Sequence, residues 1–215
     1  MRNLLLFFTL LIAACANPVN QVTADRYFKA GKGFAYKGQW FDARMAYSRA
    51  WTNATMGNLG DNVTASYAFE YGVASGAICD WPESEKGIME ALEIDKKIDI
   101  PIYADLAQLA FMFNAKGDLV KSSEYFSLSL DAAERAKMES KDPVGTGYIL
   151  NEYAKVLSKL NKSEEAKLIT TREQELHRLY SDKFEISQDI VEKSRNLHFP
   201  IGKYCGQKSS GLSVW

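Results

Sequence analysis

The sequence predicts an all-α fold built from consecutive helical hairpins, and three observations lead to it. Beyond the first part of the chain, apolar side chains recur at spacings of three and four, the period of one helix face. No segment there shows the alternation of apolar and polar residues that marks a half-buried strand. Turn-forming residues divide the chain into about eight helices of ordinary length. Helices joined by such short connections pack as antiparallel pairs.

Residues 1–14 are predicted to be a signal peptide that is removed and takes no part in the fold. Arg2 provides a short basic start, and residues 4–12 form an apolar run broken only by Thr9. A helix of that length reaches about 14 Å, whereas the hydrocarbon core of a bilayer is about 30 Å thick. The segment is therefore too short to span a membrane and has the layout of a secretory signal.

Cys15 follows this apolar run directly, and two cleavage sites compete there. Residues 12–15, Ile-Ala-Ala-Cys, resemble a bacterial lipobox. That resemblance implies lipidation of Cys15 with acyl chains such as palmitate, cleavage before it, and a lipidated linker over residues 15–23. Several acyl chains hold a protein firmly at a membrane. In Gram-negative lipoproteins an Asp directly after the cysteine often signals retention in the inner membrane. Ala16 stands at this position, which resembles lipoproteins that go to the outer membrane. The alternative is cleavage before Asn17, which would remove Cys15 and release a soluble secreted protein.

The predicted helices of residues 24–195 carry an internal repeat. The breakers fall at residues 57–61, 80–82, 100–101, 116–118, 142–145 and 161–163. Four turns align at Gly38, Cys79, Gly117 and Asn161. Seven residues before each turn stand the small residues Gly31, Gly72, Ala110 and Ala154, and five after it stand Ala43, Ser84, Ser122 and Ala166. Small residues at a helix crossing let two backbones approach closely, so each unit is predicted to be a tight hairpin that stacks on its neighbours.

This repeat resembles the tetratricopeptide repeat. The first unit, residues 24–58, carries the family's pattern at Tyr27, Ala30, Gly31, Phe34, Gly38, Ala43, Tyr47 and Ala50. The third unit fits well, and the second and fourth fit less well. The turns lie 41, 38 and 44 residues apart, whereas the family period is about 34 residues. The resemblance implies a right-handed superhelix of about four hairpins, with longer helices or loops than usual.

In that family the first helix of each hairpin lines a concave groove that binds the ligand. The resemblance places the partner-binding positions at Phe28, Lys32, Tyr36, Phe69, Phe111, Asn114, Asn151 and Lys155, with Tyr148 beside them. Aromatic anchors among a few polar groups suit a protein or peptide partner. The alternative for Phe28, Phe69 and Phe111 is packing between neighbouring repeats.

The C-terminal extension, residues 196–215, lies outside the repeat. If Cys15 is lipidated or removed, Cys79 and Cys205 remain as an even pair in an oxidising compartment. We expect a disulfide between them that ties the extension back to the helices. The alternative is that Cys79 is a small buried residue. Trp215 at the end of the chain is a candidate to dock into a groove of this chain or of a partner.

Charge and motifs exclude several kinds of ligand. The formal net charge is −1, so no basic surplus exists to neutralise phosphates, and nucleic acid is not expected as a ligand. The chain has no glycine-rich nucleotide-binding motif of either common type, so we expect no nucleotide. His177 and His198 do not form a metal-binding pair, so neither a metal nor another cofactor is expected.

The sequence offers one weak catalytic arrangement, the pair of Cys205 and His198, which could form a nucleophile. We expect no enzyme activity. The predicted function is a membrane-anchored scaffold or adaptor that binds a protein or peptide partner in the bacterial cell envelope, at the outer membrane facing the periplasm. The alternatives are a small-molecule or glycan-binding module of the envelope and a soluble secreted repeat protein.

Overall fold

The computed structural model describes the backbone of residues 2–185 and 196–211, and side chains from residue 19 onward within those ranges. These residues form helices and no strand, so the predicted all-α class is confirmed. The helices are α1 (Arg2–Tyr36), α2 (Trp40–Gly57), α3 (Asp61–Ala77), α4 (Trp81–Lys97), α5 (Tyr103–Lys116), α6 (Leu119–Arg135), α7 (Met138–Lys141), α8 (Pro143–Lys159), α9 (Ser163–Leu179) and α10 (Ser181–Phe184).

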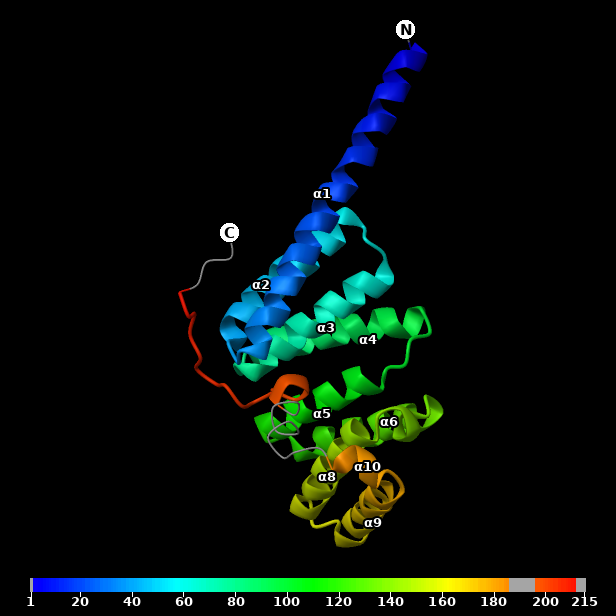
Figure 1. Cartoon of the computed structure of the whole chain (residues 1–215), viewed down its shortest axis with the longest axis vertical. Coiled ribbons are helices and arrows are strands. Elements are labelled where there is room, and N and C mark those ends of the chain that lie inside the picture. The colour runs from blue at the N-terminus through cyan, green and yellow to red at the C-terminus, as the bar shows by residue number, and fades with distance from the viewer. Residues whose placement is uncertain (1, 186–195, 212–215) are drawn as a thin grey trace.

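The long helices pack as neighbouring pairs: α1 with α2, α3 with α4, α5 with α6, and α8 with α9. Figure 1 shows these four hairpins stacked in chain order, with α1 extending beyond the stack at the N-terminal end. Helix α1 runs without a break through the predicted signal peptide, the predicted linker and the first repeat helix. Among the described residues, no helix is both long enough and apolar enough to cross a membrane.

The four hairpins share one turn geometry. The residues aligned from the sequence, Gly38, Cys79, Gly117 and Asn161, all have positive φ, at 71°, 68°, 83° and 60°. In every hairpin this residue's N–H donates to the carbonyl three positions before it, and the N–H of the following residue donates to the carbonyl five positions before that residue. These hydrogen bonds measure 2.9–3.1 Å and satisfy the last carbonyls of the first helix. Each hairpin therefore reverses at the same repeat position.

The small residues lie where the helices of a pair cross. A Cβ atom at Gly31 would lie 2.6 Å from ring carbons of Tyr47, and one at Gly72 would lie 2.6 Å from the backbone nitrogen of Ile88. Gly87 meets Gly72 from the other helix, since its own Cβ would lie 2.8 Å from the Gly72 Cα. Helices α3 and α4 therefore approach backbone to backbone, although the second unit matched the repeat pattern less well.

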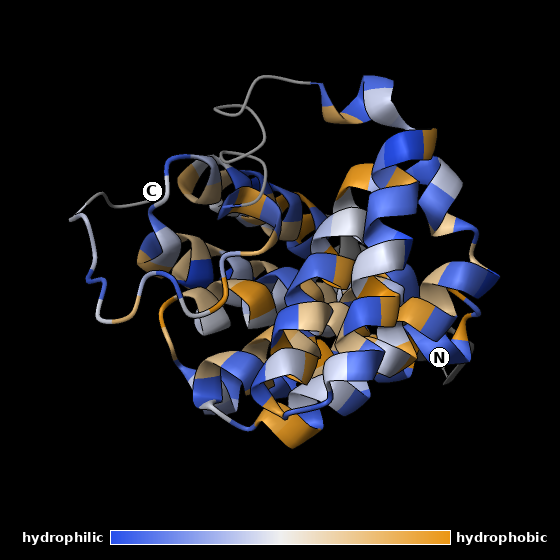
Figure 2. Ribbon diagram, turned by 90° about the horizontal axis from the view of Figure 1, so that it is seen from below, coloured by the Kyte–Doolittle hydropathy of each residue, from blue (hydrophilic) through white to orange (hydrophobic). Residues whose placement is uncertain are grey.

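The core lies between the hairpins. Its largest cluster joins α4, α5, α6, α8 and α9 around the fully buried Leu109, Met112, Phe126 and Leu150. Two smaller clusters, around Trp40 and around Ala50, join α1, α2 and α3. Figure 2 shows apolar and hydrophilic residues alternating along the ribbons, as expected for helices with one buried face. The short helix α7 lies between the third and fourth hairpins and lengthens that interval.

Candidate protein-binding face

Residues 196–211, called the strap below, run back along the stack of hairpins. Figure 1 shows the strap passing from the level of α5 toward α2. It touches α8 and α5 first, then the end of α3, and finally the start of α2. The strap thus contacts all four hairpins and is held on them in an irregular, non-helical conformation beyond its first residues.

An aromatic cluster holds the first part of the strap. The Phe199 ring lies 5.1 Å from the Phe111 ring and 4.7 Å from the Tyr148 ring, measured between centroids. Phe111 and Tyr148 stack on each other at 5.6 Å. The side-chain amide of Gln108 donates a 2.7 Å hydrogen bond to the carbonyl of His198. This part of the face therefore recognises an aromatic ring together with a backbone carbonyl.

Backbone hydrogen bonds hold the middle of the strap. The N–H of Gly202 donates to the Gly76 carbonyl, and the N–H of Tyr204 donates to the Ala77 carbonyl, both at 2.9 Å. The Gly76 carbonyl also accepts the turn hydrogen bond from Cys79, and a carbonyl oxygen has two lone pairs, so it can accept from the strap as well. Ile201 packs on Gly76, where an added Cβ would lie 2.9 Å from the Ile201 Cγ1. Glycine at this position gives the strap room to approach.

A disulfide between Cys79 and Cys205 fixes the strap to the turn between α3 and α4. Their Cα atoms lie 5.0 Å apart, and 126 residues separate them in the sequence. Because the sulfur of Cys205 is bonded, it is no nucleophile, and the Cys205 and His198 pair loses its chemistry.

The end of the strap covers the N-terminus of α2. The Gln207 side chain accepts a 3.0 Å hydrogen bond from the N–H of Phe41. Asp42 accepts hydrogen bonds from the Ser209 hydroxyl at 2.9 Å and from the Ser210 N–H at 3.0 Å. Burial of Asp42 acts to raise its pKa, but the hydrogen bonds from Ser210 and Ser209 outweigh it and hold this pKa below its usual value. The ionised form of Asp42 therefore stabilises the bound strap.

The predicted partner-binding residues of the first hairpin differ in their exposure. Tyr36 is 81% exposed. Lys32 is exposed, and its ammonium nitrogen lies 5.1 Å from the centre of the Phe28 ring. Phe28 is half-buried and packs between Tyr47 and Tyr67, at centroid distances of 5.6 and 4.2 Å. Phe28 is thus a packing residue between the first two hairpins, while Lys32 and Tyr36 remain accessible.

The other predicted positions differ in exposure. Phe111 is 8% exposed and lies under Phe199 of the strap. Phe69, Asn114 and Asn151 are half-buried. Lys155 is exposed and pairs with Glu152 of the same helix at 2.6 Å. The role of these residues as partner contacts stays a prediction.

Glu70 on α3 is half-buried near Lys32, and no motif in the sequence points to it. Burial raises the pKa of Glu70 to about 7, and the nearby charge of Lys32 offsets part of that rise. Burial and the proximity of Glu70 also raise the pKa of Tyr47. Repeat periodicity places Glu70 on a helix, but it carries no signal for the burial that raises this pKa.

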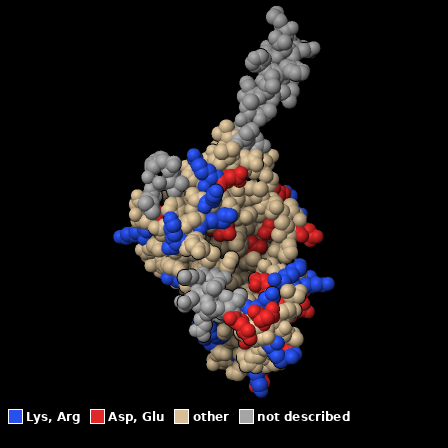
Figure 3. Space-filling view, in the orientation of Figure 1, with Lys and Arg blue, Asp and Glu red and all other residues tan. Residues whose placement is uncertain are grey.

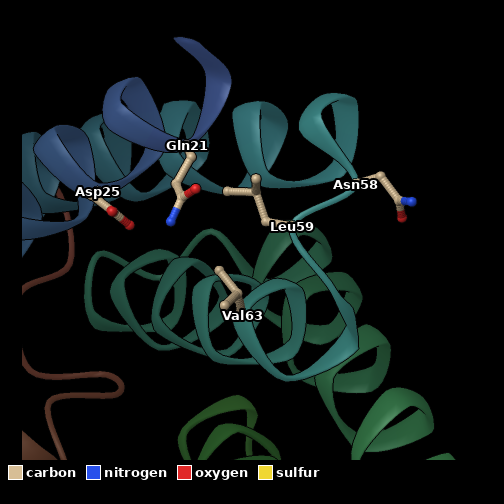
Figure 4. Close-up of a pocket in the computed structure, with 5 residues that line it drawn as sticks. All are labelled: Gln21, Asp25, Asn58, Leu59 and Val63. Atoms are coloured by element: carbon tan, nitrogen blue, oxygen red, sulfur yellow. The ribbon is translucent and has the colours of Figure 1, made fainter. Parts of the chain in front are cut away.

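A small pocket of about 170 Å³ lies between α1, the α2–α3 turn and α3. Its lining residues are Gln21, Asp25, Asn58, Leu59 and Val63. Figure 4 shows the side chains of Leu59 and Val63 approaching Gln21, while the Asn58 side chain points away. Pockets that enclose a drug-sized ligand measure about 300–1,000 Å³. This pocket is smaller than that and does not favour the small-molecule alternative.

The described residues provide no cluster of three or more side chains that could hold a metal ion. His177 stacks on Phe184 with ring centroids 3.6 Å apart and lies 3.0 Å from a carboxylate oxygen of Glu173. His198 contributes its backbone carbonyl to the strap contact described above. Both histidines therefore make contacts within the fold.

No protein-family model matches this chain, and no curated protein is detectably similar to it in sequence. The geometry of the helical hairpins and the strap is therefore the basis for a functional proposal.

Proposed function

We propose that this protein is a membrane-anchored helical-repeat scaffold of the tetratricopeptide type that binds an extended segment of a protein partner in the bacterial cell envelope. The observation that carries the proposal is the strap. The helical face holds a non-helical stretch of chain through an aromatic cluster and through hydrogen bonds to backbone groups. Those are the interactions with which protein surfaces bind peptides.

The surface charge is consistent with a protein partner. Figure 3 shows acidic and basic side chains interspersed over one face of the molecule. Such a face lacks the continuous basic stripe that binds a phosphate backbone. The accessible residues of the first hairpin, Lys32 and Tyr36, combine a charge with an exposed aromatic ring. Exposed aromatic side chains are common anchors at protein interfaces.

The partner-binding proposal is tested by capture after cross-linking in cells, with two matched variants. Tyr36→Ala removes a side chain that is 81% exposed on the predicted groove, and Leu168→Ala removes one that is 70% exposed on α9. We expect Tyr36→Ala to lower recovery of the partner about tenfold and Leu168→Ala to leave it unchanged. Equal recovery from both variants and the wild type would contradict a binding site on this face.

We propose that lipidated Cys15 anchors the scaffold at the outer membrane. Helix α1 runs on from Cys15 into the first hairpin, so an anchor there would be coupled directly to the helical stack. Growth with an alkyne-bearing fatty acid followed by fluorophore coupling tests this. We expect wild type and Ala16→Ser to be labelled and to sediment with membranes. Cys15→Ala should be unlabelled and soluble. Labelling of Cys15→Ala, or no labelling of the wild type, would refute the anchor.

A further inference from the structure

The strap covers a site that can be described separately from its occupant. The site consists of Gln108 and Phe111 on α5, Tyr148 on α8 and Gly76 at the end of α3. We infer that this site binds an extended segment of a partner protein in which an aromatic residue precedes an aliphatic residue and a glycine, and that the strap is an exchangeable competitor for it. This inference rests on the proposed function and names the partner chemistry.

The site is formed by residues of the hairpins, and these residues also pack on one another. The Phe111 ring is fixed by Phe126 at 5.2 Å and by Tyr148 at 5.6 Å, and all three residues belong to helices. Gly76 lies in the last turn of α3. Side chains locked by packing on rigid helices keep a binding site in place when its occupant leaves.

One polar group in the site is only partly used by the strap. Gln108 is 4% exposed, and its amide nitrogen donates to the His198 carbonyl. Its amide oxygen is buried and has no hydrogen-bond partner among the described residues. An unpaired buried acceptor costs free energy. A segment that offered an N–H to this oxygen would therefore make a contact that the strap lacks.

The attachments of the strap are divided between two places. Phe199 and the His198 carbonyl contact α5 and α8, whereas the disulfide at Cys205 and the bonds to Asp42 lie over the first two hairpins. Residues 198–202 can therefore leave the site while the later part of the strap stays attached. A tethered segment competes at an effective concentration in the millimolar range. A free peptide should then bind the native protein weakly.

The strap contacts define the chemistry that a competing segment needs. The aromatic ring fills the space beside Phe111 and Tyr148, and the aliphatic side chain packs on Gly76. The next residue donates its N–H to the Gly76 carbonyl and has φ of +79° at Gly202, a conformation that favours glycine.

The test uses a fluorescent peptide with the sequence of residues 196–204 and the full-length, disulfide-bonded protein, with binding followed by anisotropy. Phe199→Ala in the protein weakens the tethered competitor and leaves the site intact. We expect the peptide to bind Phe199→Ala at least tenfold more tightly than wild type. Leu168→Ala should bind like wild type. A peptide with Ala in place of its phenylalanine should bind none of these proteins.

Two further variants keep the test decisive. Ile201→Ala weakens the strap at a different contact and should also tighten peptide binding, which covers the case in which Phe199→Ala folds poorly. Adding Gln108→Leu to Phe199→Ala should weaken peptide binding about tenfold through the lost hydrogen bond to the backbone carbonyl. Equal affinity of Phe199→Ala and Ile201→Ala with wild type would overturn the inference. Partner recovery that still depends on Tyr36 would then leave the proposed function standing.

Discussion

Two regions of the helical face use similar residues for different purposes. Under the strap, Phe111 and Tyr148 stack together and receive Phe199 from outside the hairpins. On the first hairpin, Phe28 packs against rings of its own neighbouring helices, and Tyr36 is left exposed. The offset of a residue within its repeat therefore fixes which way its side chain faces. Whether that side chain meets a neighbour, a strap or solvent depends on residues far away in the sequence.

The largest loss of stability is expected when the strap is released from the turn between α3 and α4. Cys205→Ser removes a disulfide that closes a 126-residue separation, and we expect unfolding free energy to fall by about 2–4 kcal/mol. Hydrogen exchange should show loss of protection at the Gly202 amide and unchanged protection at the Ser84 amide. Chemical denaturation measures the first effect. Unchanged stability together with a protected Gly202 amide would show that the disulfide does not hold the strap.

The second variant disturbs the packing of α3 against α4. Gly72→Ala places a Cβ 2.6 Å from the Ile88 nitrogen, so overpacking should destabilise the protein by about 1–3 kcal/mol. Gly33→Ala is the matched control, because nothing lies within 4 Å of its added Cβ. It should stabilise the helix by about 0.5–1 kcal/mol. Thermal melting compares the two, and shifts of the same sign would refute the close crossing of α3 and α4.

Each region also has a carboxyl whose burial raises its pKa to about 7: Glu70 on α3 and Asp105 on α5. Burial is the main cause at Asp105, with the charge of Asp95 adding to it. A raised folded-state pKa favours the neutral acid, so this stabilisation is full below pH 4 and is lost as pH rises toward 7. Asp105→Asn should therefore raise stability by about 1–2 kcal/mol at pH 8 and by little at pH 4.

Melting curves from pH 4 to pH 8 measure this difference, with Asp131→Asn on the exposed surface of α6 as the control. Glu70→Gln should show the same trend in the uncovered region. A constant stability difference between Asp105→Asn and wild type across this range would mean that Asp105 is already ionised in the folded protein.

The smallest expected effect concerns the end of the strap. Asp42→Ala removes the acceptor for Ser209 and Ser210 and should cost about 0.5–1.5 kcal/mol. The pKa of Asp42 lies below its usual value in the fold, so this contribution is present above pH 4 and is lost as pH falls through the folded-state pKa. Denaturation at pH 7 and pH 3 measures it, and an equal loss at both pH values would exclude the ionised carboxylate as the cause.

Local patterns in the sequence predicted the hairpins because their geometry depends on local residues. The positive φ values at Gly38, Cys79, Gly117 and Asn161 fall at the aligned turns. The small side chain of Gly72 predicts the close crossing, but its partner Gly87 lies outside the repeat pattern and was not predicted. The pair of Cys79 and Cys205 predicts one tie between the strap and the helices, but not the rest of the strap's path. The contacts of the strap join residues far apart in the sequence, and sequence periodicity does not indicate such contacts.

The most direct test of peptide binding on this face uses a photo-cross-linking amino acid placed singly in the full-length protein in cells. We expect a discrete protein adduct from Tyr36 on α1 and no such adduct from Leu168 on α9, although both side chains are exposed. The same adduct from both positions, or from Leu168 alone, would contradict the assignment of partner binding to the face lined by the first helices of the hairpins.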